Sequence, residues 1–138
     1  MEKPIKFILS VLCSMAFPLA AQAVSGGKQV IIDKGSQTLR AYDNGKLVMQ
    51  SRISTGKEGK ATPSGHFRAG EKSRMHYSKL YHNAPMPYSV NFGGNYFIHG
   101  FSSVPHHPAS HGCVRLPIGA ASKFYQWVAP GTPITITG

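Results

Sequence analysis

The sequence predicts a small, mainly β domain of the sandwich or barrel type with one α-helix late in the chain. Residues 28–55 are rich in β-branched and apolar residues, interrupted by an Asn-Gly dipeptide typical of hairpin turns. The C-terminal segment "TPITITG" alternates isoleucine with threonine, as a half-buried strand does. Only the stretch after Pro117 repeats apolar residues at helical spacing. A chain of 138 residues fits one domain.

The first predicted element is a β-hairpin centred on Asn44-Gly45. These residues readily adopt the positive φ values that a two-residue hairpin turn requires. The turn would place Asp43 opposite Lys46 and Tyr42 opposite Leu47. We expect strands over 28–33, 37–43 and 46–54.

The middle of the chain contains a glycine-rich loop and a buried strand. Residues 56–66, "GKEGKATPSGH", hold three glycines and one proline, so "TPSG" is interpreted as a turn, and a strand is expected to resume at 66–68. The polar segment 72–85 carries several aromatics and histidines and supports no assignment. The apolar run "YFIHG" at 96–100 predicts a core strand that delivers His99 to a sheet edge or end.

The C-terminal part predicts a loop, one helix and a last strand. Residues 101–110 include two prolines and are expected to be irregular. Pro117 fits a first helical turn, where its missing N–H costs nothing. Apolar residues then recur at helical spacing up to the Pro130-Gly131 stop: Ile118, Ala121, Tyr125 and Val128.

The first 23 residues have the features of a signal peptide. Lys3 and Lys6 precede the apolar run 7–20, and the small residues of "AQA" end at Ala23. The run is shorter than the about 20 apolar residues that a membrane-spanning helix needs. We therefore expect cleavage after Ala23 and a domain over 24–138. That domain would have no stable membrane span and would be exported to the periplasm or cell envelope.

The charge balance predicts an anionic partner or a solvated basic surface. The chain has 15 Lys and Arg against 5 Asp and Glu, a net charge of +10 with histidine neutral. Such a charge would hold the protein against anionic envelope polymers by sequence-independent attraction. Nucleic acid is not expected as a partner, because the leader indicates export and no RNA- or DNA-binding motif is present.

Cys113, within "ASHGCVRLP", remains as the single thiol once the leader and its Cys13 are removed. Such a cysteine in an oxidising compartment is a buried inert thiol, an intermolecular bridge or a reactive group. A nucleophilic cysteine needs a nearby histidine or positive charge that lowers its pKa. The candidates for that role are His99, His111 and Arg115.

Two further features bear on the chemistry of this segment. Acyl transfer requires donors aimed at the developing oxyanion, and Gly112 suits a turn that presents the N–H groups of Gly112 and Cys113. The plain alternative is that histidine and cysteine are packing residues here. A zinc site is the other alternative, but His106 and His107 are adjacent between prolines and lack the spacing of paired ligands.

The motif set resembles the L,D-transpeptidase catalytic domain, also called the YkuD family. "IHG", a loop and then "SHGCVR" form the specific part of the resemblance. Further segments occur in the expected order over nearly the whole chain after the leader: "VIIDKGSQTLRAYDNGKLV", "STG", "TPSG" and "MPYSVNF".

The resemblance implies an envelope enzyme that cuts the bond between the third residue and the terminal D-alanine of a peptidoglycan tetrapeptide stem. The acyl group would pass to cysteine and then to an amine. An amine on another stem would give a 3→3 cross-link, and an amine on an envelope protein would give an attachment. Transfer to water would make the enzyme an L,D-carboxypeptidase. No metal or organic cofactor is implied.

The resemblance also assigns roles to residues. Cys113 is the nucleophile and His99 the general base, oriented by a backbone carbonyl such as that of Gly100. His111 and the Gly112 and Cys113 amides would form or support the oxyanion hole, and Ser110 would fix the turn. Residues expected to contact substrate are Arg115, Met86 and Tyr88. Arg115 would bind a stem carboxylate through its guanidinium fork, or alternatively form a surface ion pair.

Two departures from the family pattern concern the acceptor. The loop between His99 and Ser110 is shorter than in many members, and the chain contains no wall-binding module. The competing interpretation is a peptidoglycan-binding or inhibitor-like protein that keeps the fold without the chemistry.

Overall fold

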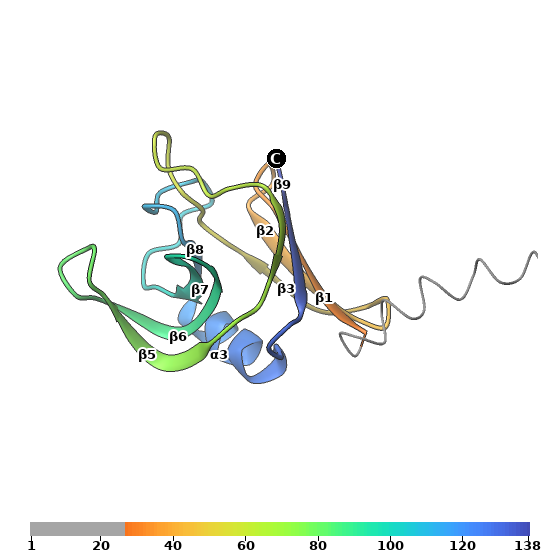
Figure 1. The fold of residues 1–138 in the computed structure, drawn as a ribbon. Helices are drawn as coiled ribbons and strands as arrows, with labels where there is room; N and C mark the ends of the chain where they lie inside the picture. Colours follow the sequence, from red (N-terminus) through yellow and green to blue (C-terminus); the bar gives the residue numbers. More distant parts are fainter. Residues whose placement is uncertain (1–26) are drawn as a thin grey trace, which may run out of the picture.

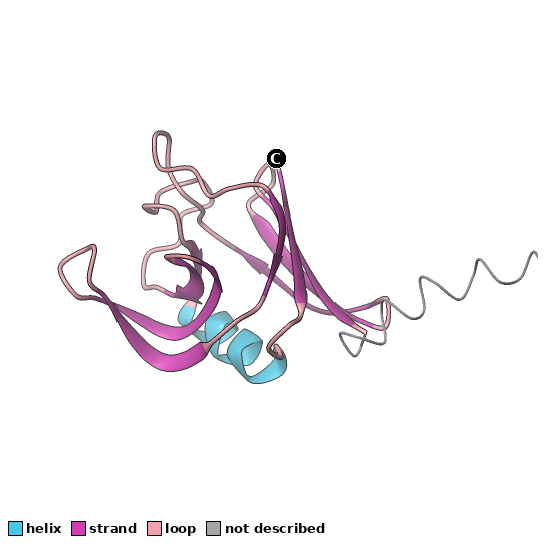
Figure 2. Ribbon diagram, in the orientation of Figure 1, coloured by secondary structure: helices cyan, strands magenta, loops and turns pink. Residues whose placement is uncertain are grey.

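The computed structural model describes residues 27–138. The expected signal peptide, its cleavage site and Cys13 lie outside the described residues. The described part is mainly β, with two sheets and one helix, as the sequence predicts (Figures 1 and 2). No helix in this part is long and apolar enough to cross a membrane.

The larger sheet has five strands in the order β3-β2-β1-β9-β4. Its first three strands form an antiparallel meander, β1 pairs in parallel with β9, and β9 pairs antiparallel with β4. The last strand of the chain therefore lies inside the sheet, next to the first. The strands are β1 (Lys28–Asp33), β2 (Thr38–Asp43), β3 (Lys46–Arg52), β4 (Gly65–Arg68) and β9 (Pro133–Thr137).

The predicted hairpin is confirmed in its turn and register. Asn44 and Gly45 have φ values of 52° and 83°, as a two-residue hairpin turn requires, and Tyr42 and Asp43 lie opposite Leu47 and Lys46. The predicted end of β3 was two residues too long. The backbone at residue 54 leaves this sheet and pairs with Arg115 of the segment that carries Cys113.

The smaller sheet has four strands in the order β5-β6-β7-β8. Segment 72–85, which the sequence left unassigned, forms strand β5 and the connection to β6. β7 and β8 run parallel, because the connection over 101–113 brings the chain back to the start of β7 before β8 begins. The strands are β5 (Lys72–Ser78), β6 (Ala84–Gly93), β7 (Tyr96–Gly100) and β8 (Val114–Leu116).

The helix of the described residues, α3 (Ile118–Trp127), begins directly after Pro117 and contacts β6 and β7 of the smaller sheet. Pro117 occupies the cap position just before the helix, so its missing N–H leaves no intrahelical bond broken. Ala121 and Phe124 are buried on the inner face of the helix. Ile118, which was expected on that face, is the first residue of the helix and is 47% exposed.

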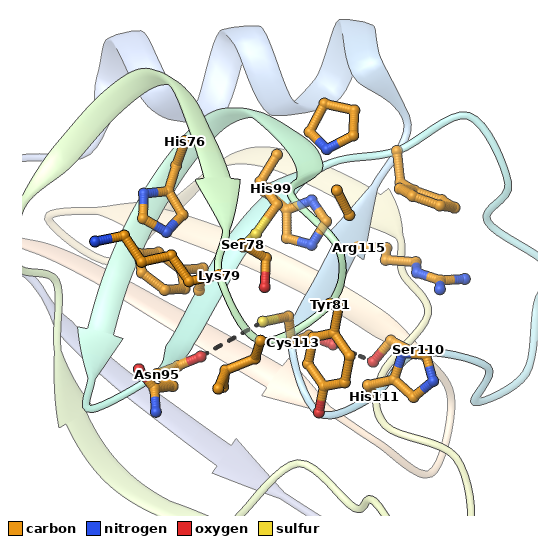
Figure 3. Close-up of a pocket in the computed structure, with 16 residues that line it drawn as sticks. His76, Ser78, Lys79, Tyr81, Asn95, His99, Ser110, His111, Cys113 and Arg115 are labelled. Carbon is orange, nitrogen blue, oxygen red and sulfur yellow. Dashed lines mark hydrogen bonds between the residues drawn. The ribbon is translucent and has the colours of Figure 1, made fainter.

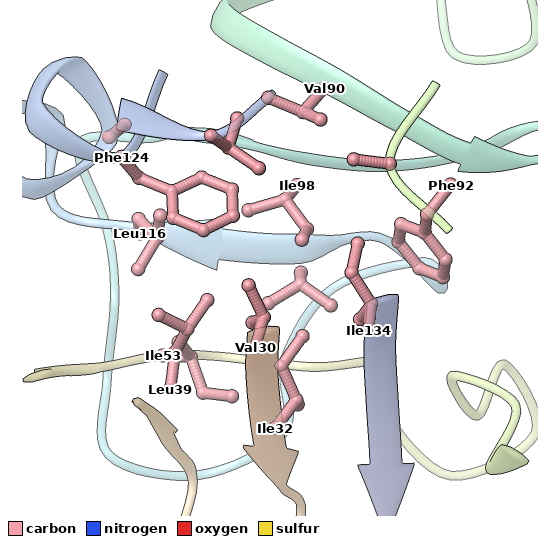
Figure 4. Packing of buried hydrophobic residues seen from close by; sticks show 14 of the residues in the cluster. Val30, Ile32, Leu39, Ile53, Val90, Phe92, Ile98, Leu116, Phe124 and Ile134 are labelled. Atoms are coloured by element: carbon pink, nitrogen blue, oxygen red, sulfur yellow. The ribbon is translucent and has the colours of Figure 1, made fainter. Parts of the chain in front are cut away.

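The core lies between the two sheets and under the helix (Figure 4). Alternation along β1 sends Val30 and Ile32 inward, and β9 contributes Ile134 in the same layer. From the other side, Ile98 of β7 and Phe124 of α3 meet them. Both residues are fully buried. This core fixes the positions of β7 and β8, whose other face carries the candidate site.

Candidate active site

A cavity of about 360 Å³ opens on the face of β7 and β8 that points away from the core. Cys113 and His99 both line it, and their side chains point into the same space (Figure 3). Its wall on one side comes from β5 and the connection to β6. On the other side it comes from the segment around Ser110 and from Arg115.

Strand alternation explains why Cys113 and His99 share one cavity. β7 and β8 are parallel and in register, with His99 opposite Arg115. Side chains two residues apart on a strand lie on the same face. His99 and Arg115 therefore project to the cavity side, together with Cys113 just before β8. The residues between them, Ile98 and Val114, are fully buried in the core.

His99 is held as a neutral base with its free nitrogen toward the cavity. Its Nδ1 lies 2.8 Å from the Gly100 carbonyl oxygen. A carbonyl only accepts, so Nδ1 carries the proton and Nε2 is left as the acceptor. Burial, aided by the charges of Arg115 and His76, lowers the pKa of His99 to about 4, although the bond to Gly100 opposes this shift. His99 is thus neutral at physiological pH.

Gly100 also serves the packing of this strand against the helix. A Cβ at this position would lie 3.1 Å from the Ala121 Cβ and 3.4 Å from the Ile118 Cα. The glycine therefore lets α3 approach β7 closely at the point where the His99 ring is fixed.

Cys113 is a thiol in the resting protein, contrary to the expectation of a lowered pKa. Burial raises the pKa of Cys113, and it outweighs the lowering effects of a backbone hydrogen bond from Phe97 and of the Arg115 charge. The Sγ lies 3.8 Å from the Asn95 carbonyl oxygen, a contact that only the protonated thiol makes as donor. A neutral thiol beside a neutral imidazole therefore replaces the expected thiolate.

Ser110 fixes the turn before the cysteine. Its Oγ accepts the Gly112 N–H at 3.0 Å and donates to the Cys113 carbonyl at 2.5 Å. Gly112 has a φ of 130°, a value that side-chain-bearing residues rarely adopt, and a Cβ there would lie 3.2 Å from the Tyr96 ring. Because its N–H is bound to Ser110, Gly112 does not supply the free oxyanion donor that the sequence predicted.

A second layer of hydrogen bonds anchors this turn to segments 54–56 and 62–65. The Thr62 hydroxyl donates to the Gly112 carbonyl at 2.7 Å and accepts the Gly56 N–H at 2.9 Å. Ser54 and Arg115 exchange backbone hydrogen bonds of 3.0 and 2.9 Å. Sequence reasoning treated "TPSG" as a simple turn and so missed Thr62, which is fully buried.

The expected substrate-contact residues fall into two groups. Met86 lines the cavity, and so does Arg115, whose guanidinium lies 4.1 Å from the centre of the Phe101 ring. Tyr88 does not line it, which corrects the prediction. Its left-handed φ of 53° breaks the alternation of β6, and its ring packs 5.7 Å from that of Tyr125 on α3.

His111 lies at the rim of the cavity and is exposed. Its ring stacks on Tyr81, with centroids 4.5 Å apart and an interplanar angle of 12°. Tyr81 belongs to the connection between β5 and β6, so the stack joins that connection to the turn before Cys113. Sequence reasoning missed this residue and also His76, Lys79 and Asn95, all of which line the cavity. The only signal was the clustering of aromatics and histidines in 72–85.

The histidines considered as metal ligands lie elsewhere. His106 Nε2 is 3.2 Å from the Ser36 carbonyl oxygen, and His107 Nδ1 is 3.2 Å from that of Pro108. Within residues 27–138 no group of three His, Cys, Asp or Glu side chains is placed to hold a metal ion.

Comparisons with known proteins identify the family of this chain. The sequence profile of the YkuD family, the L,D-transpeptidase catalytic domain, matches residues 27–136. A crystal structure of an L,D-transpeptidase from Stackebrandtia nassauensis is 32% identical with a TM-score of 0.76, over 81% of this chain and 56% of that chain. The one from Xylanimonas cellulosilytica is 33% identical with a TM-score of 0.74, over 81% and 61%.

A more distant L,D-transpeptidase, from Mycobacterium smegmatis, shares the fold at 20% identity, with a TM-score of 0.75 over 81% of this chain and 59% of that one. No match was found among curated protein sequences. The chain aligns with 56–61% of the length of these three relatives. The profile match over nearly all described residues and the identities above 30% establish the relationship: the chain belongs to the L,D-transpeptidase catalytic domain family.

Proposed function

We propose that the protein is a cysteine acyltransferase that acts on peptidoglycan tetrapeptide stems. The observation that carries this proposal is the placement of Cys113 and His99 in one cavity, with the Nε2 of His99 as hydrogen-bond acceptor. Family membership supports the same chemistry and substrate class. The residues do not need to form an ion pair at rest, because a neutral imidazole can take the thiol proton during attack.

The first half-reaction forms a thioester. The Cys113 Sγ attacks the carbonyl carbon of the third stem residue while its proton passes to His99 Nε2. The developing oxyanion accepts a hydrogen bond from the Cys113 N–H, since that of Gly112 is bound to Ser110. The carbon–nitrogen bond to the terminal D-alanine then breaks. The leaving amine receives the proton from His99, and the positive charge on the imidazole lasts only through this intermediate.

The second half-reaction resolves the thioester by the reverse proton path. An acceptor amine gives its proton to His99 Nε2 and attacks the thioester carbon, and the Cys113 sulfur leaves and is reprotonated. A side-chain amine of another stem yields a 3→3 cross-link, and an amine of an envelope protein yields an attachment. Water in place of the amine would release a tripeptide stem, as an L,D-carboxypeptidase does.

The proposed place of action is the periplasm or cell envelope. The basic n-region, the apolar run and the "AQA" site of residues 1–23 support export, with 24–138 as the catalytic domain. Residues 24–138 keep 13 Lys and Arg against 4 Asp and Glu, a net charge of +9 that would hold the enzyme near anionic envelope polymers.

Mass spectrometry of the purified protein with a disaccharide-tetrapeptide tests the proposal. We expect loss of terminal alanine with a cross-linked dimer as product, and no reaction with Cys113→Ala or His99→Ala. Free tripeptide alone would indicate the carboxypeptidase. An unreactive wild type that still binds the tetrapeptide would favour the non-catalytic binding protein and contradict the proposal.

A second test uses a covalent probe. One relative of known structure, 22% identical, carries imipenem. We expect imipenem to add its mass to the wild type and not to Cys113→Ala. If the wild type stays unmodified by imipenem but still releases alanine from the tetrapeptide, the proposed reaction stands and only the probe does not fit the site.

A further inference from the structure

The charged side chains that line the cavity are all basic or histidine. Lys79 and His76 stand on the wall formed by β5, and Arg115 stands on the opposite wall, with Cys113 and His99 between them (Figure 3). The described residues include four acidic side chains, and none of the four lines the cavity: Asp33, Asp43, Glu58 and Glu71. The cavity is thus suited to a ligand that carries negative charge on both sides of the scissile bond.

The β5 wall is built close to the nucleophile. The His76 ring stacks on Phe97, with centroids 4.6 Å apart and an interplanar angle of 24°. Phe97 is the β7 residue beside Cys113, because the next residues of the two strands, Ile98 and Val114, are paired. The stack therefore fixes the imidazole one strand away from the sulfur. Lys79, just after the end of β5, adds a flexible ammonium to the same wall.

The opposite wall carries a better-oriented cation. Arg115 is two residues beyond Cys113, which places its Cα about 7 Å from that of the nucleophile on the same strand face. The contact with Phe101 at 4.1 Å orients the guanidinium, which can then bind a carboxylate with two parallel hydrogen bonds. Burial lowers the pKa of Arg115, while the side chain keeps its charge.

We propose that His76 and Lys79 bind a free carboxylate on the side chain of the third stem residue, while Arg115 binds the carboxylate of the terminal residue. This inference rests on the proposed function and specifies its donor. A third residue of the diaminopimelate type carries such a side-chain carboxylate. A lysine at that position carries only an ammonium, which the basic wall repels. An amidated diaminopimelate likewise keeps its side-chain ammonium but has lost the carboxylate that the wall would bind. The enzyme therefore selects stems with a free third-residue carboxylate.

Steady-state kinetics with three matched donors tests this selection. The donors are tetrapeptide stems with diaminopimelate, its side-chain amide or lysine at the third position. We expect the wild type to prefer free diaminopimelate over the amide at least tenfold in kcat/KM. Lys79→Ala and His76→Gln should reduce that preference to about threefold or less, through a higher KM for the free acid alone. Lys123→Ala, which removes a lysine on α3 that does not line the cavity, should behave as wild type.

Arg115 provides the internal contrast. Arg115→Gln should slow all three donors similarly, because each has the same terminal carboxylate. A wild type with equal kcat/KM for the free acid and the amide would overturn the inference. So would an unchanged preference in Lys79→Ala and His76→Gln, once circular dichroism shows the same melting curve as the wild type.

Binding to the inactive Cys113→Ala variant separates this inference from the proposed function. Calorimetric titration should show tighter binding of the free acid than of the amide, with the difference lost when Lys79→Ala is added. If the wild type turns over no donor but this binding difference is found, the proposed function fails and the inference stands. If donors are turned over but bind Cys113→Ala without discrimination, the inference fails alone.

Discussion

The two faces of β7 and β8 have opposite compositions although they share one backbone. The inner face presents Ile98, Val114 and Leu116, all fully buried against the larger sheet. The outer face presents His99 and, in the preceding turn, Cys113, both directed into the cavity. Successive side chains along these strands thus alternate between the hydrophobic core and the cavity.

The site depends on the core for the position of its side chains, whereas the core does not depend on the site for its stability. On these two strands, His99 follows the buried Ile98, and Arg115 lies between the buried Val114 and Leu116. Changes on the outer face should therefore alter reactivity with little loss of folding free energy, and changes on the inner face should do the opposite.

The largest expected effect comes from the outer face. Replacing His99 with Gln removes the imidazole that we propose as general base and should reduce kcat by roughly 10³-fold, within the usual range for a lost general base. The measurement is release of terminal alanine, with the urea unfolding midpoint as control. A variant with a tenth of the wild-type rate or more would show that another group takes the proton.

The matched change on the inner face is Ile98→Ala. It should lower the free energy of unfolding by about 2–5 kcal/mol, because it leaves a cavity in a fully buried site. Urea denaturation measures this loss. Below the unfolding transition, the remaining folded protein should keep most of its kcat. Strong loss of kcat with little loss of stability would break the separation between the two faces.

The turn chemistry at Asn44-Gly45 shows why part of the fold could be predicted. Register there depends on two adjacent residues, and the structure pairs the flanking residues as expected. β8, with three residues, is too short to give a periodic pattern and is recognisable only once β7 lies beside it. Tyr88 was misplaced because its positive φ inverts the strand alternation, which no local residue type announces.

The site was predictable in its residues and not in its electrostatics. The motifs indicated Cys113, His99 and the Gly100 carbonyl, which the structure places together. The protonation state of the thiol depends on burial in three dimensions, and burial reverses the shift that nearby cations alone would cause. Whether the Gly112 N–H is free likewise depends on the folded turn, in which it donates a hydrogen bond to the Ser110 hydroxyl.

The pH dependence of stability follows from the buried His99. Its pKa is about 4 in the folded protein against 6.5 as the ordinary value, so the unfolded chain binds a proton more readily between these values. Above about pH 6.5 His99 is neutral in both states and costs no folding free energy. As the pH drops to 4, protonation of the unfolded chain should lower the free energy of unfolding by about 3 kcal/mol. Unfolding at pH 7 and 4.5 should show a smaller difference for His99→Gln than for the wild type.

The acid limb of kcat/KM reports on the same group. We expect activity to persist below pH 6 and to decline near pH 4, where the free enzyme's base becomes protonated. A decline centred near pH 6.5 would mean that the imidazole is more exposed than its 5% indicates.

The smallest expected effect on turnover comes from Ser110, in the turn before Cys113, which belongs to neither face. Ser110→Ala removes one acceptor and one donor and should cost about 1–3 kcal/mol of stability, because buried polar groups are left unpaired. It also frees the Gly112 N–H. Turnover should fall by a smaller factor than in His99→Gln, and Ser110→Thr, which retains the hydroxyl, should restore much of the stability. Equal losses in both variants would indicate a packing role for Ser110.

The position of β9 has a consequence for the order of synthesis. Val30, near the start of the described chain, is paired with Ile134, and β4 has no partner in its sheet except β9. The larger sheet cannot close until residues 133–137 have been made and can pair with β1 and β4, so completion of this sheet waits for them. A chain that still lacks residues 133–137 has no completed core behind β7 and β8, and its thiol therefore remains idle until β9 is in place.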